Sequence, residues 1–389
     1  MDGGTREDEL RHAEAAVRHL AAIPDRGSAS PGELAAASWI HEQLSAAGLE
    51  SRIEPERAHG THWWPYGLPS ALASLSAFGA IARGSRGSRA LAAGLGLSGA
   101  AAVIEDVAGT HRVLRRLLPQ RDTTNVIAEA GDPTGPTVVI HAHHDAAHGG
   151  VMFHPAISRV DGPIPSMATV AAGPGLVGLA ALGRRRRPLI FAAAFAAINA
   201  LLFADSGRRR AVPGANDDAS GVAALALLAR RFALDPPRGV RVVVLSTGSE
   251  ESMLEGMTAF ARRHFGSLPP ATTGFVSIDS VGWDVLALRS GEGALRLRPA
   301  SARFRELLRE AAAERGLELR DGVRFWIPTD GYVALKAGFE EVNVGSEQAD
   351  GSHPNYHSDT DLPDAVNYAT VVDAADIVEA LVRRIGTQR

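Results

Sequence analysis

Two pairs of long stretches without a charged residue constrain the fold of this 389-residue chain more than any other feature. The four stretches are residues 66–82, 90–104, 162–183 and 188–204. An arginine-rich turn joins the two members of each pair, around residues 83–89 in the first and 184–187 in the second. We therefore predict two inserted apolar helical hairpins, hairpin 1 over residues 61–117 and hairpin 2 over residues 149–211. Pro174 lies between two glycines and is expected to interrupt its helix.

The hairpins have two interpretations that the sequence leaves open. A membrane-spanning helix needs about 20 apolar residues, with a range of about 17–25, and only residues 162–183 reach that length fully. In a membrane, the arginine-rich turns would face the cytoplasm and the rest of the chain would face outward. In a soluble cytoplasmic protein, the same helices would pack together as a lid over a site or as a dimer surface. The sequence predicts no oligomeric state.

Outside the hairpins, short apolar runs alternate with amphipathic segments. We expect helices over residues 10–20, 31–44, 219–230, 302–315 and 372–384, and strands over residues 49–53, 125–128, 137–142, 240–246 and 274–278. Strands that alternate with helices favour an α/β fold with a mostly parallel central sheet flanked by helices. We treat residues 1–389 as a single domain that carries the two hairpins as insertions.

Composition excludes several classes of site and partner. The chain contains no cysteine, which rules out a disulfide framework, a thiolate zinc site and a cysteine nucleophile. Any bound metal must therefore be held by His, Asp and Glu. The net charge of −4 gives no basic field, so we expect no nucleic-acid partner.

Five polar clusters stand out, each expected just after a strand, where open α/β sheets place their sites. The clusters are residues 142–145, 214–221, 248–251, 277–280 and 356–361. Each is weak evidence alone, because adjacent carboxylates before a helix are common caps and Glu250-Glu251 is typical of a solvated surface. Taken together, two histidines and several carboxylates suit a two-metal hydrolase. Such a site needs a carboxylate shared by both cations, and a further carboxylate to take a proton from water.

In order and local sequence, the five clusters resemble the co-catalytic dizinc aminopeptidase family, which includes bacterial leucyl aminopeptidases. Glutamate carboxypeptidase, transferrin receptor and glutaminyl cyclase are relatives of that family. The resemblance covers about residues 5–58, 122–148 and 212–385 and leaves both hairpins unmatched.

The resemblance implies two Zn²⁺ ions and assigns a role to each motif residue. His143 and Asp279 would bind one zinc, Glu251 and His357 the other, and Asp217 would bridge them. Glu250 would be the general base, and a cis peptide is expected after Asp217.

The resemblance also implies that Asp145 would orient His143. The segment 326–332, with Asp330 and Gly331, would wall the substrate pocket. His144 departs from the family pattern, and His141, His148, His154 and His353 lie near the motifs, most of them as expected bystanders.

The predicted activity is that of a metallo-aminopeptidase, which hydrolyses the N-terminal amide bond of a peptide or small amide through a dizinc-bridged water. The first alternative is a single-zinc amide hydrolase or a glutaminyl-cyclase-like enzyme. The second is a non-catalytic membrane or interaction protein on the same scaffold.

Overall fold

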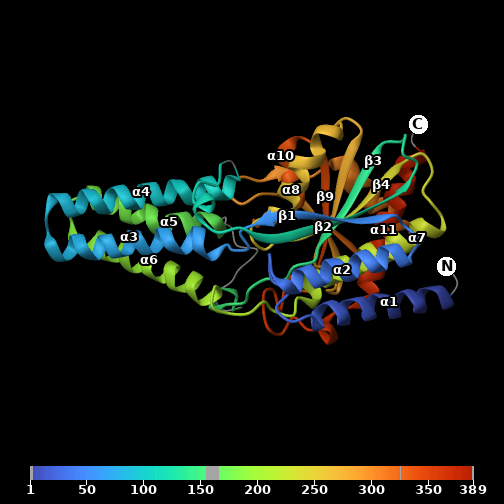
Figure 1. Cartoon of the computed structure of the whole chain (residues 1–389), viewed down its shortest axis with the longest axis horizontal. Helices are drawn as coiled ribbons and strands as arrows, with labels where there is room; N and C mark the ends of the chain where they lie inside the picture. Colours follow the sequence, from blue (N-terminus) through green and yellow to red (C-terminus); the bar gives the residue numbers. More distant parts are fainter. Residues whose placement is uncertain (1–2, 110, 155–165, 325, 388–389) are drawn as a thin grey trace.

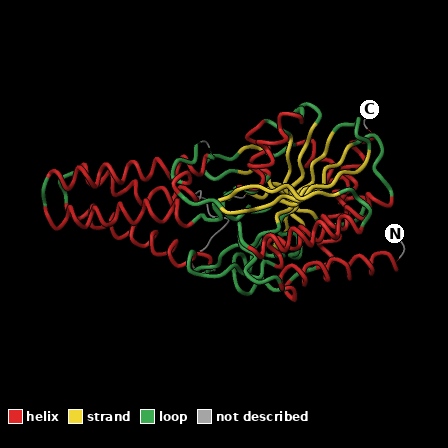
Figure 2. The backbone as a smooth tube through the Cα atoms, in the orientation of Figure 1, coloured by secondary structure: helices red, strands yellow, loops and turns green. Residues whose placement is uncertain are grey.

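The computed structural model describes residues 3–109, 111–154, 166–324 and 326–387. A part built from a sheet and its covering helices occupies one end of the molecule, and four long helices form a rod that projects from it (Figure 1). Figure 2 shows that the strands are confined to the first part and that the rod is helical throughout. The predicted α/β fold class with two apolar helical insertions is thus confirmed.

The elements have the following bounds. The helices are α1 (Gly3–Ala22), α2 (Pro31–Ala46), α3 (Trp63–Arg83), α4 (Arg86–Ala108), α5 (Ser166–Leu182), α6 (Arg186–Ser206), α7 (Gly221–Leu234), α8 (Glu255–His264), α9 (Ala302–Glu314), α10 (Gly331–Ala337) and α11 (Tyr368–Thr387). The strands are β1 (Ser51–Ala58), β2 (Arg121–Gly131), β3 (Thr137–His143), β4 (Arg241–Thr247), β5 (Thr273–Ile278), β6 (Val285–Glu292), β7 (Arg298–Pro299), β8 (Leu319–Arg324) and β9 (Glu340–Glu347).

Four parallel strands form the centre of the sheet. The strand order is β1-β2-β4-β3-β5-β9-β6-β7, and β8 pairs with β6. Strands β4, β3, β5 and β9 are mutually parallel, whereas β1 and β2 pair antiparallel with their neighbours and β6 pairs antiparallel with β9 and β7. The pairing of β8 with β6 is parallel. The parallel centre is as predicted, and the flanking strands make the sheet mixed. Because parallel strands end on the same side, the carboxyl ends of β3, β4 and β5 lie next to one another.

Alternating side chains on the strands build two cores. Val138 and Ile140 of β3 pack against α1, α2, α7, α9 and α11 on one face. Val139, between them, packs against α8 and α10 on the other face, together with Phe275. This period of two explains why β3, β4 and β5 are apolar runs, since both of their faces are buried.

All ten elements expected outside the hairpins are present, with shifted ends. The first expected strand, over residues 49–53, begins later and runs further, as β1. Strands β6 and β9 and helices α8 and α10 were not expected from the sequence. Polar residues interrupt the apolar pattern of β6, and buried Glu341 and Asn343 do the same in β9.

The two hairpins pack together as one four-helix bundle of α3, α4, α5 and α6 (Figure 1). Its interior is built from alanines with Val177 and Leu189. Gly96 of α4 lies against Gly178 of α5 so closely that a Cβ on Gly96 would be 2.4 Å from the Gly178 nitrogen. Small residues thus allow close helix packing. Residues 162–165 of the third apolar stretch lie outside the described residues.

Helix α5 runs without a break through Pro174, so the expected interruption was wrong. Proline removes a single backbone donor, and an α-helix can continue through it when its neighbours support the turn. Here Gly96 and Gly99 of α4 pack closely against the Pro174 turn and support it.

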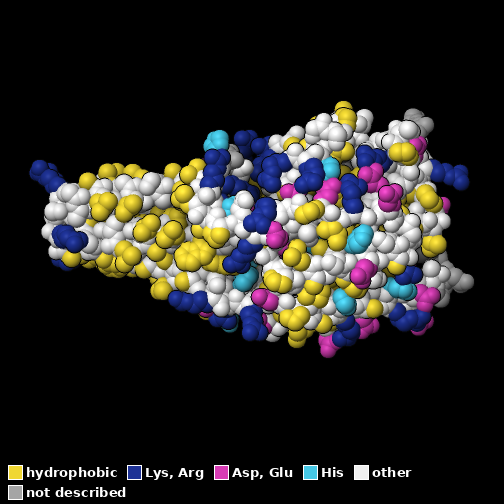
Figure 3. Space-filling view, in the orientation of Figure 1, with side chains coloured by type: hydrophobic (Ala, Val, Ile, Leu, Met, Phe, Trp, Pro, Cys, Tyr) yellow, Lys and Arg dark blue, Asp and Glu magenta, His cyan; other side chains and the backbone are white. Residues whose placement is uncertain are grey.

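The outer surface of the bundle is also apolar. Figure 3 shows hydrophobic side chains along the rod, with arginines at its far tip and again where it joins the sheet-containing part. Leu75 of α3, Phe191 of α6 and Leu201 of α6 are 68%, 69% and 67% exposed. The other large apolar side chains that α3–α6 expose are Trp64, Leu68, Leu72, Phe78, Leu91, Leu97, Ile104, Leu176, Leu179, Leu182, Ile190 and Ile198.

Candidate metal centre

The five residues predicted to bind metal come together at the carboxyl ends of the central strands. His143 is the last residue of β3, Glu251 follows the end of β4, and Asp279 follows the end of β5. Asp217 lies in the short segment Ala215–Ser220 that precedes α7, and His357 lies in the loop after β9. All five are buried or nearly so.

Asp217 lies between the two histidines. Its Oδ1 atom is 3.3 Å from Nε2 of His143, and its Oδ2 atom is 3.1 Å from Nε2 of His357. Nε2 of His357 is also 3.4 Å from Oε1 of Glu251. The expected cis peptide is present between Asp217 and Asp218.

These separations are those of atoms that share a zinc ion. Zinc–nitrogen and zinc–oxygen bonds are about 2.0–2.1 Å long, so two tetrahedral ligands lie about 3.3–3.4 Å apart. The His143–Asp217 and His357–Glu251 distances of 3.3 and 3.4 Å match that value, and the His357–Asp217 distance of 3.1 Å is slightly shorter. The donor set of imidazoles and carboxylates is also one that zinc accepts.

A second cluster, on the β5 side of the site, contains Asp279. Single ligating atoms of His143, Asp218 and Asp279 lie within 4.8 Å of one another, as do those of His143, Asp217 and Glu251. Asp218, however, already accepts three backbone hydrogen bonds. Its Oδ1 accepts from Gly221 and Ser280, both at 3.0 Å, and its Oδ2 accepts from the His143 N–H at 3.2 Å. We therefore assign Asp218 to positioning, a role that its place before a helix did not reveal.

Negative charge dominates the site. Burial raises the pKa of Glu250 well above its ordinary value. The charge of His143 opposes this shift, and the charge of Glu251 adds to it. Burial opposes the protonation of His357, but Glu251 and Asp217 raise its pKa to about 10. Asp330 is a further carboxyl group at the site, and burial raises its pKa to about 7. A divalent cation would balance this excess of carboxylates, so the residues present fit a metal.

Asp145 holds the loop that carries the two glutamates. Its Oδ1 accepts a hydrogen bond from the Glu250 N–H at 3.0 Å, and its Oδ2 accepts from the Glu251 N–H at 3.1 Å and from the Ser28 hydroxyl at 2.6 Å. Its Oδ1 also lies 3.4 Å from Nδ1 of His143, the ring atom opposite Asp217. Burial opposes its ionisation, but the hydrogen bond with His143 and the charge of that ring lower the pKa of Asp145.

Two more buried residues position the site. The Arg26 guanidinium donates to the carbonyl of His144 at 2.7 Å and to the carbonyl of Gly214 at 2.8 Å, and so joins two site segments. Asp361 accepts from the backbone N–H groups of Asn216 and Asp217 at 2.9 and 3.1 Å. Burial raises the pKa of Asp361 to about 7. The sequence showed Asp361 only as a neighbour of His357, and nothing pointed to Arg26.

The remaining histidines have other roles. His144 contacts the Ser246 hydroxyl, and His148 contacts the Arg209 carbonyl. His141 is buried beside Phe275. His353 packs edge-on against the Trp283 ring.

Two residues of the segment 326–332 have contacts inside the sheet-containing part. Tyr332 is buried in the cluster around α8 and α10. Asp330 accepts a hydrogen bond from Thr247, at the end of β4.

Comparison with known proteins agrees with this geometry. Residues 195–382 match peptidase family M28, which confirms the resemblance predicted from the motifs and supports a zinc-dependent enzyme that hydrolyses peptides. A search of curated proteins found no match.

Several solved structures share the fold. The chain resembles an aminopeptidase from Aneurinibacillus sp. strain AM-1 with a TM-score of 0.58 and 16% identity, covering 96% of this chain and 93% of that one. It resembles a zinc aminopeptidase from Bacillus subtilis with a TM-score of 0.58 and 13% identity, covering 96% and 94%. It also resembles a glutaminyl cyclase from Fimbriiglobus ruber, with a TM-score of 0.57 and 15% identity, covering 96% of this chain and 94% of that one.

Proposed function

We propose that this chain, whose residues 195–382 match peptidase family M28, is a zinc-dependent aminopeptidase that uses two metal ions. The observation that carries the proposal is the Asp217 carboxylate, which turns one oxygen to His143 and the other to His357. A carboxylate shared in this way is what two neighbouring cations require. A single-zinc site gives no reason for the second histidine to contact the same carboxylate.

Each predicted ligand has a place in this scheme. His143 and Asp279 would hold one zinc, Glu251 and His357 would hold the other, and Asp217 would lie between them. When bound, the zinc ions polarise the scissile carbonyl and lower the pKa of a water molecule.

Glu250 is the proposed general base. It lies next to Glu251 but makes none of the Asp217 contacts, so we assign its carboxylate to accept a proton from water. Glu250 would then deliver this proton to the leaving amine. Asp145 fixes the backbone of Glu250 and contacts His143, so we propose it as the residue that positions both.

Substrates with free and blocked N-termini test the aminopeptidase activity. We expect hydrolysis of leucine amide and Leu-Gly-Gly, no hydrolysis of N-acetyl-Leu-Gly-Gly, and a loss of about 10²–10⁴-fold in kcat for Glu250→Gln. Equal cleavage of the free and blocked peptides would contradict an aminopeptidase. Release of ammonia from an N-terminal glutaminyl peptide, without peptide cleavage, would identify a cyclase instead.

We also propose that the bundle α3–α6 spans a membrane and anchors the peptidase. Helices α4 and α6 are long and apolar enough to cross a bilayer, although such helices alone are weak evidence. The exposed apolar surface of the bundle adds a second observation. At 1.5 Å per residue, the uncharged lengths of α3 and α6 cover about 25–30 Å, close to the hydrocarbon thickness of a bilayer.

The arginines set the proposed orientation. Arg83, Arg86 and Arg89 lie at the turn between α3 and α4, and residues 184–187 lie at the turn between α5 and α6. Both turns are at the end of the bundle that points away from the sheet (Figure 1). Arginine-rich turns stay in the cytoplasm, so the peptidase would face outward. The bundle also extends away from the sheet instead of folding over the site, which favours an anchor over a lid (Figure 1).

The absence of cysteine makes this topology directly testable. Single cysteines would be introduced at Ser88, a partly exposed position near the tip, and at exposed Ser267, in the peptidase part. With a membrane-impermeant maleimide and intact cells, we expect Ser267→Cys to be labelled and Ser88→Cys to be labelled only after lysis. The reverse pattern would contradict the outward orientation, and recovery of the chain in the soluble fraction would contradict the anchor.

A further inference from the structure

The metal centre lies against the base of the bundle, which we define as residues 62–66 at the start of α3 and residues 203–206 at the end of α6. Strand β1 runs in the same direction as β4, because β2 pairs antiparallel with both. Helix α3 follows the carboxyl end of β1, and hairpin 2 follows the carboxyl end of β3. Both hairpins therefore leave the sheet at the edge where the predicted ligands gather.

The start of α3 is joined to the loop that carries Glu251. Nδ1 of His62, the residue before α3, lies 3.2 Å from the carbonyl oxygen of Glu251, within hydrogen-bond distance. The ring of His62 also packs edge-on against Trp63 of α3 and Phe203 of α6, at 5.4 and 6.2 Å between centroids. One proposed zinc ligand is thus attached directly to the base of the bundle.

The end of α6 holds a segment that packs on His357. Oδ2 of Asp205 accepts a hydrogen bond from the Val151 N–H at 2.8 Å. Val151 begins a short 3₁₀ helix that ends at Phe153. The Phe153 ring meets the ring of His357 edge-on, with 4.5 Å between centroids. The bundle therefore reaches both residues that are proposed to hold the second zinc, Glu251 and His357.

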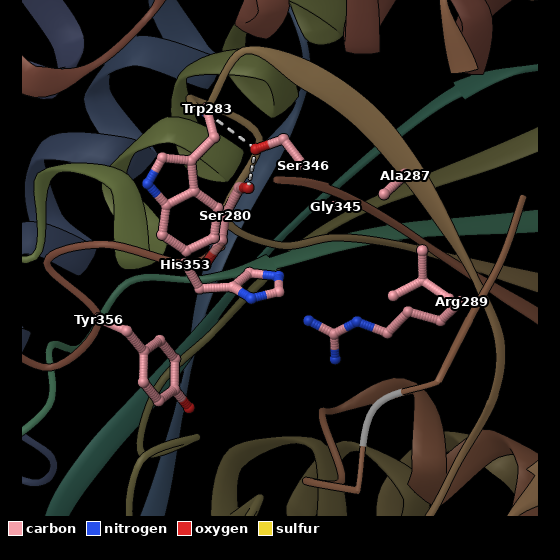
Figure 4. Close-up of a pocket in the computed structure, with 9 residues that line it drawn as sticks. Ser280, Trp283, Ala287, Arg289, Gly345, Ser346, His353 and Tyr356 are labelled. Carbon is pink, nitrogen blue, oxygen red and sulfur yellow. Dashed lines mark hydrogen bonds between the residues drawn. The ribbon is translucent and has the colours of Figure 1, made fainter. Parts of the chain in front are cut away.

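A second aromatic neighbour of His357 belongs to the sheet-containing part. The Tyr356 ring stacks on the ring of His357, with 3.9 Å between centroids. Figure 4 shows Tyr356, His353 and Trp283 along one side of a small pocket. His357 is thus contacted by one ring that the bundle holds and by one that the sheet-containing part supplies, which places it at the boundary between the two.

These contacts place the metal centre close to the proposed bilayer. The uncharged stretch of α3 begins at Tyr66, four residues after His62, which is a rise of about 6 Å along the helix. When the length of the His62 side chain is added, the Glu251 carbonyl lies about 10–15 Å from the hydrocarbon edge. The headgroup layer is itself about 5–8 Å thick on each side. The site would therefore lie at the outer limit of the headgroups.

Exposed apolar side chains mark the same edge of the molecule. Val151, in the segment that ends at Phe153, is 44% exposed, and Trp64, in the first turn of α3, is 54% exposed. Tryptophan is enriched at the level of the headgroups in membrane proteins. Apolar groups beside the metal centre are therefore suited to a bilayer surface.

We propose that the substrates of this peptidase are peptides held at the bilayer surface by an apolar or lipid-modified C-terminal part, with a short free N-terminus. A short tail that leaves the bilayer next to the bundle would reach Glu250 and the metal ligands directly. The bilayer would obstruct the approach of a bulky folded protein to the same edge. This inference rests on the proposed function, because it assigns a substrate class to a membrane-anchored aminopeptidase.

A spacer series tests how far the active site lies from the bilayer. Leu-Gly is joined through 4 or 24 Gly/Ser residues to a lipid anchor, and the zinc-loaded wild type hydrolyses both peptides in nanodiscs, which expose both faces of the bilayer. These spacers span about 11 and 27 Å. Both reach a site at 10–15 Å, but the local concentration of the N-terminus falls with about the −3/2 power of chain length. We expect the peptide with the short spacer to be cleaved about 10-fold faster.

Fluorescence quenching locates the same edge without any activity measurement. Val151→Cys and Ser267→Cys would each carry a fluorophore, in nanodiscs whose lipids carry a quencher on the headgroup. Ser267 is the matched control, because it is exposed and precedes the amino end of β5, on the side of the sheet away from the ligands. We expect strong quenching of the label at residue 151 and none at residue 267.

The outcomes separate this inference from the proposed function. Faster cleavage with the long spacer, or equal cleavage of both peptides, would overturn the inference and leave the aminopeptidase standing, as would equal quenching at the two labels. If neither these peptides nor soluble Leu-Gly-Gly is cleaved, the proposed activity fails. If the chain does not enter nanodiscs, the anchor fails and the inference falls with it. Glu250→Gln should cleave neither anchored peptide, which would assign their hydrolysis to this site.

Discussion

Replacing Asp145 with asparagine tests how the metal centre is held together. The two carboxylate oxygens of Asp145 accept three hydrogen bonds, from the Glu250 N–H, the Glu251 N–H and the Ser28 hydroxyl. An asparagine offers one oxygen and one NH₂ group. With its oxygen in the Oδ2 place it keeps two of these bonds, and its NH₂ group then faces the N–H of Glu250, which is also a donor.

The loss of zinc affinity in Asp145→Asn can be estimated from this geometry. One hydrogen bond to a charged acceptor contributes about 1.5–3 kcal/mol, and the Glu250 N–H is left without its partner. Removal of such a supporting group typically weakens metal binding by about 10–100-fold. We expect Asp145→Asn to lower zinc affinity by that amount and to lower kcat at saturating zinc, since Glu250 moves as well.

Competition for zinc with a chromogenic chelator measures the affinity of each variant, and leucine amide hydrolysis measures kcat. Ser28→Ala is the matched control. It removes one bond to Asp145 but leaves both backbone N–H groups bonded, so its zinc affinity should fall by less than about 10-fold. A zinc affinity and a kcat for Asp145→Asn that equal those of the wild type would refute this account of the loop.

Three further outcomes follow from the structure. Gly96→Leu should separate α4 from α5, because its side chain would meet the backbone of Gly178, and the melting temperature in detergent should drop. Leu75→Asp should reduce membrane insertion, at a cost of about 2.5–3.5 kcal/mol near a bilayer centre. Leu234→Asp, at an exposed position on α7, should not reduce insertion, and equal insertion of both would count against a lipid-facing bundle. Burial opposes the ionisation of Glu255, but its hydrogen bonds and the charge of Arg115 outweigh burial and lower its pKa. The stabilising effect of ionised Glu255 should therefore be complete above about pH 4.5 and be lost as the pH falls below that value. The difference in melting temperature between wild type and Glu255→Gln should therefore shrink on acidification, and a constant difference would contradict this.

The sequence predicted the centre of the sheet because β3, β4 and β5 are buried on both faces. Continuous valine and isoleucine runs mark such strands, and a polar cluster follows each of them. Strand β6 escaped prediction because Arg289 and Glu292 interrupt its apolar pattern. Those residues are buried for a reason that only the folded chain reveals, since their partners are distant in sequence.

The same limit applies to the candidate site. His143, Asp217 and His357 could be proposed together because their motifs follow a known order, and the structure brings them into contact. Arg26 and Asp218 could not, because their roles are hydrogen bonds to backbone groups, which carry no sequence signature. The sequence offered the packing of both hairpins against each other only as part of the soluble alternative. It could not show which helix faces meet, since alanine and glycine occur all around these helices and define no single packing face.

The zinc content of the purified chain, measured with the hydrolysis of aminoacyl amides, tests the central claim most directly. Wild type and Glu250→Gln should each contain about two zinc ions per chain, because Glu250 is not among the five proposed ligands. Only the wild type should hydrolyse the amides. One zinc ion or none in the wild type, or full activity in Glu250→Gln, would contradict a two-metal aminopeptidase with Glu250 as its base.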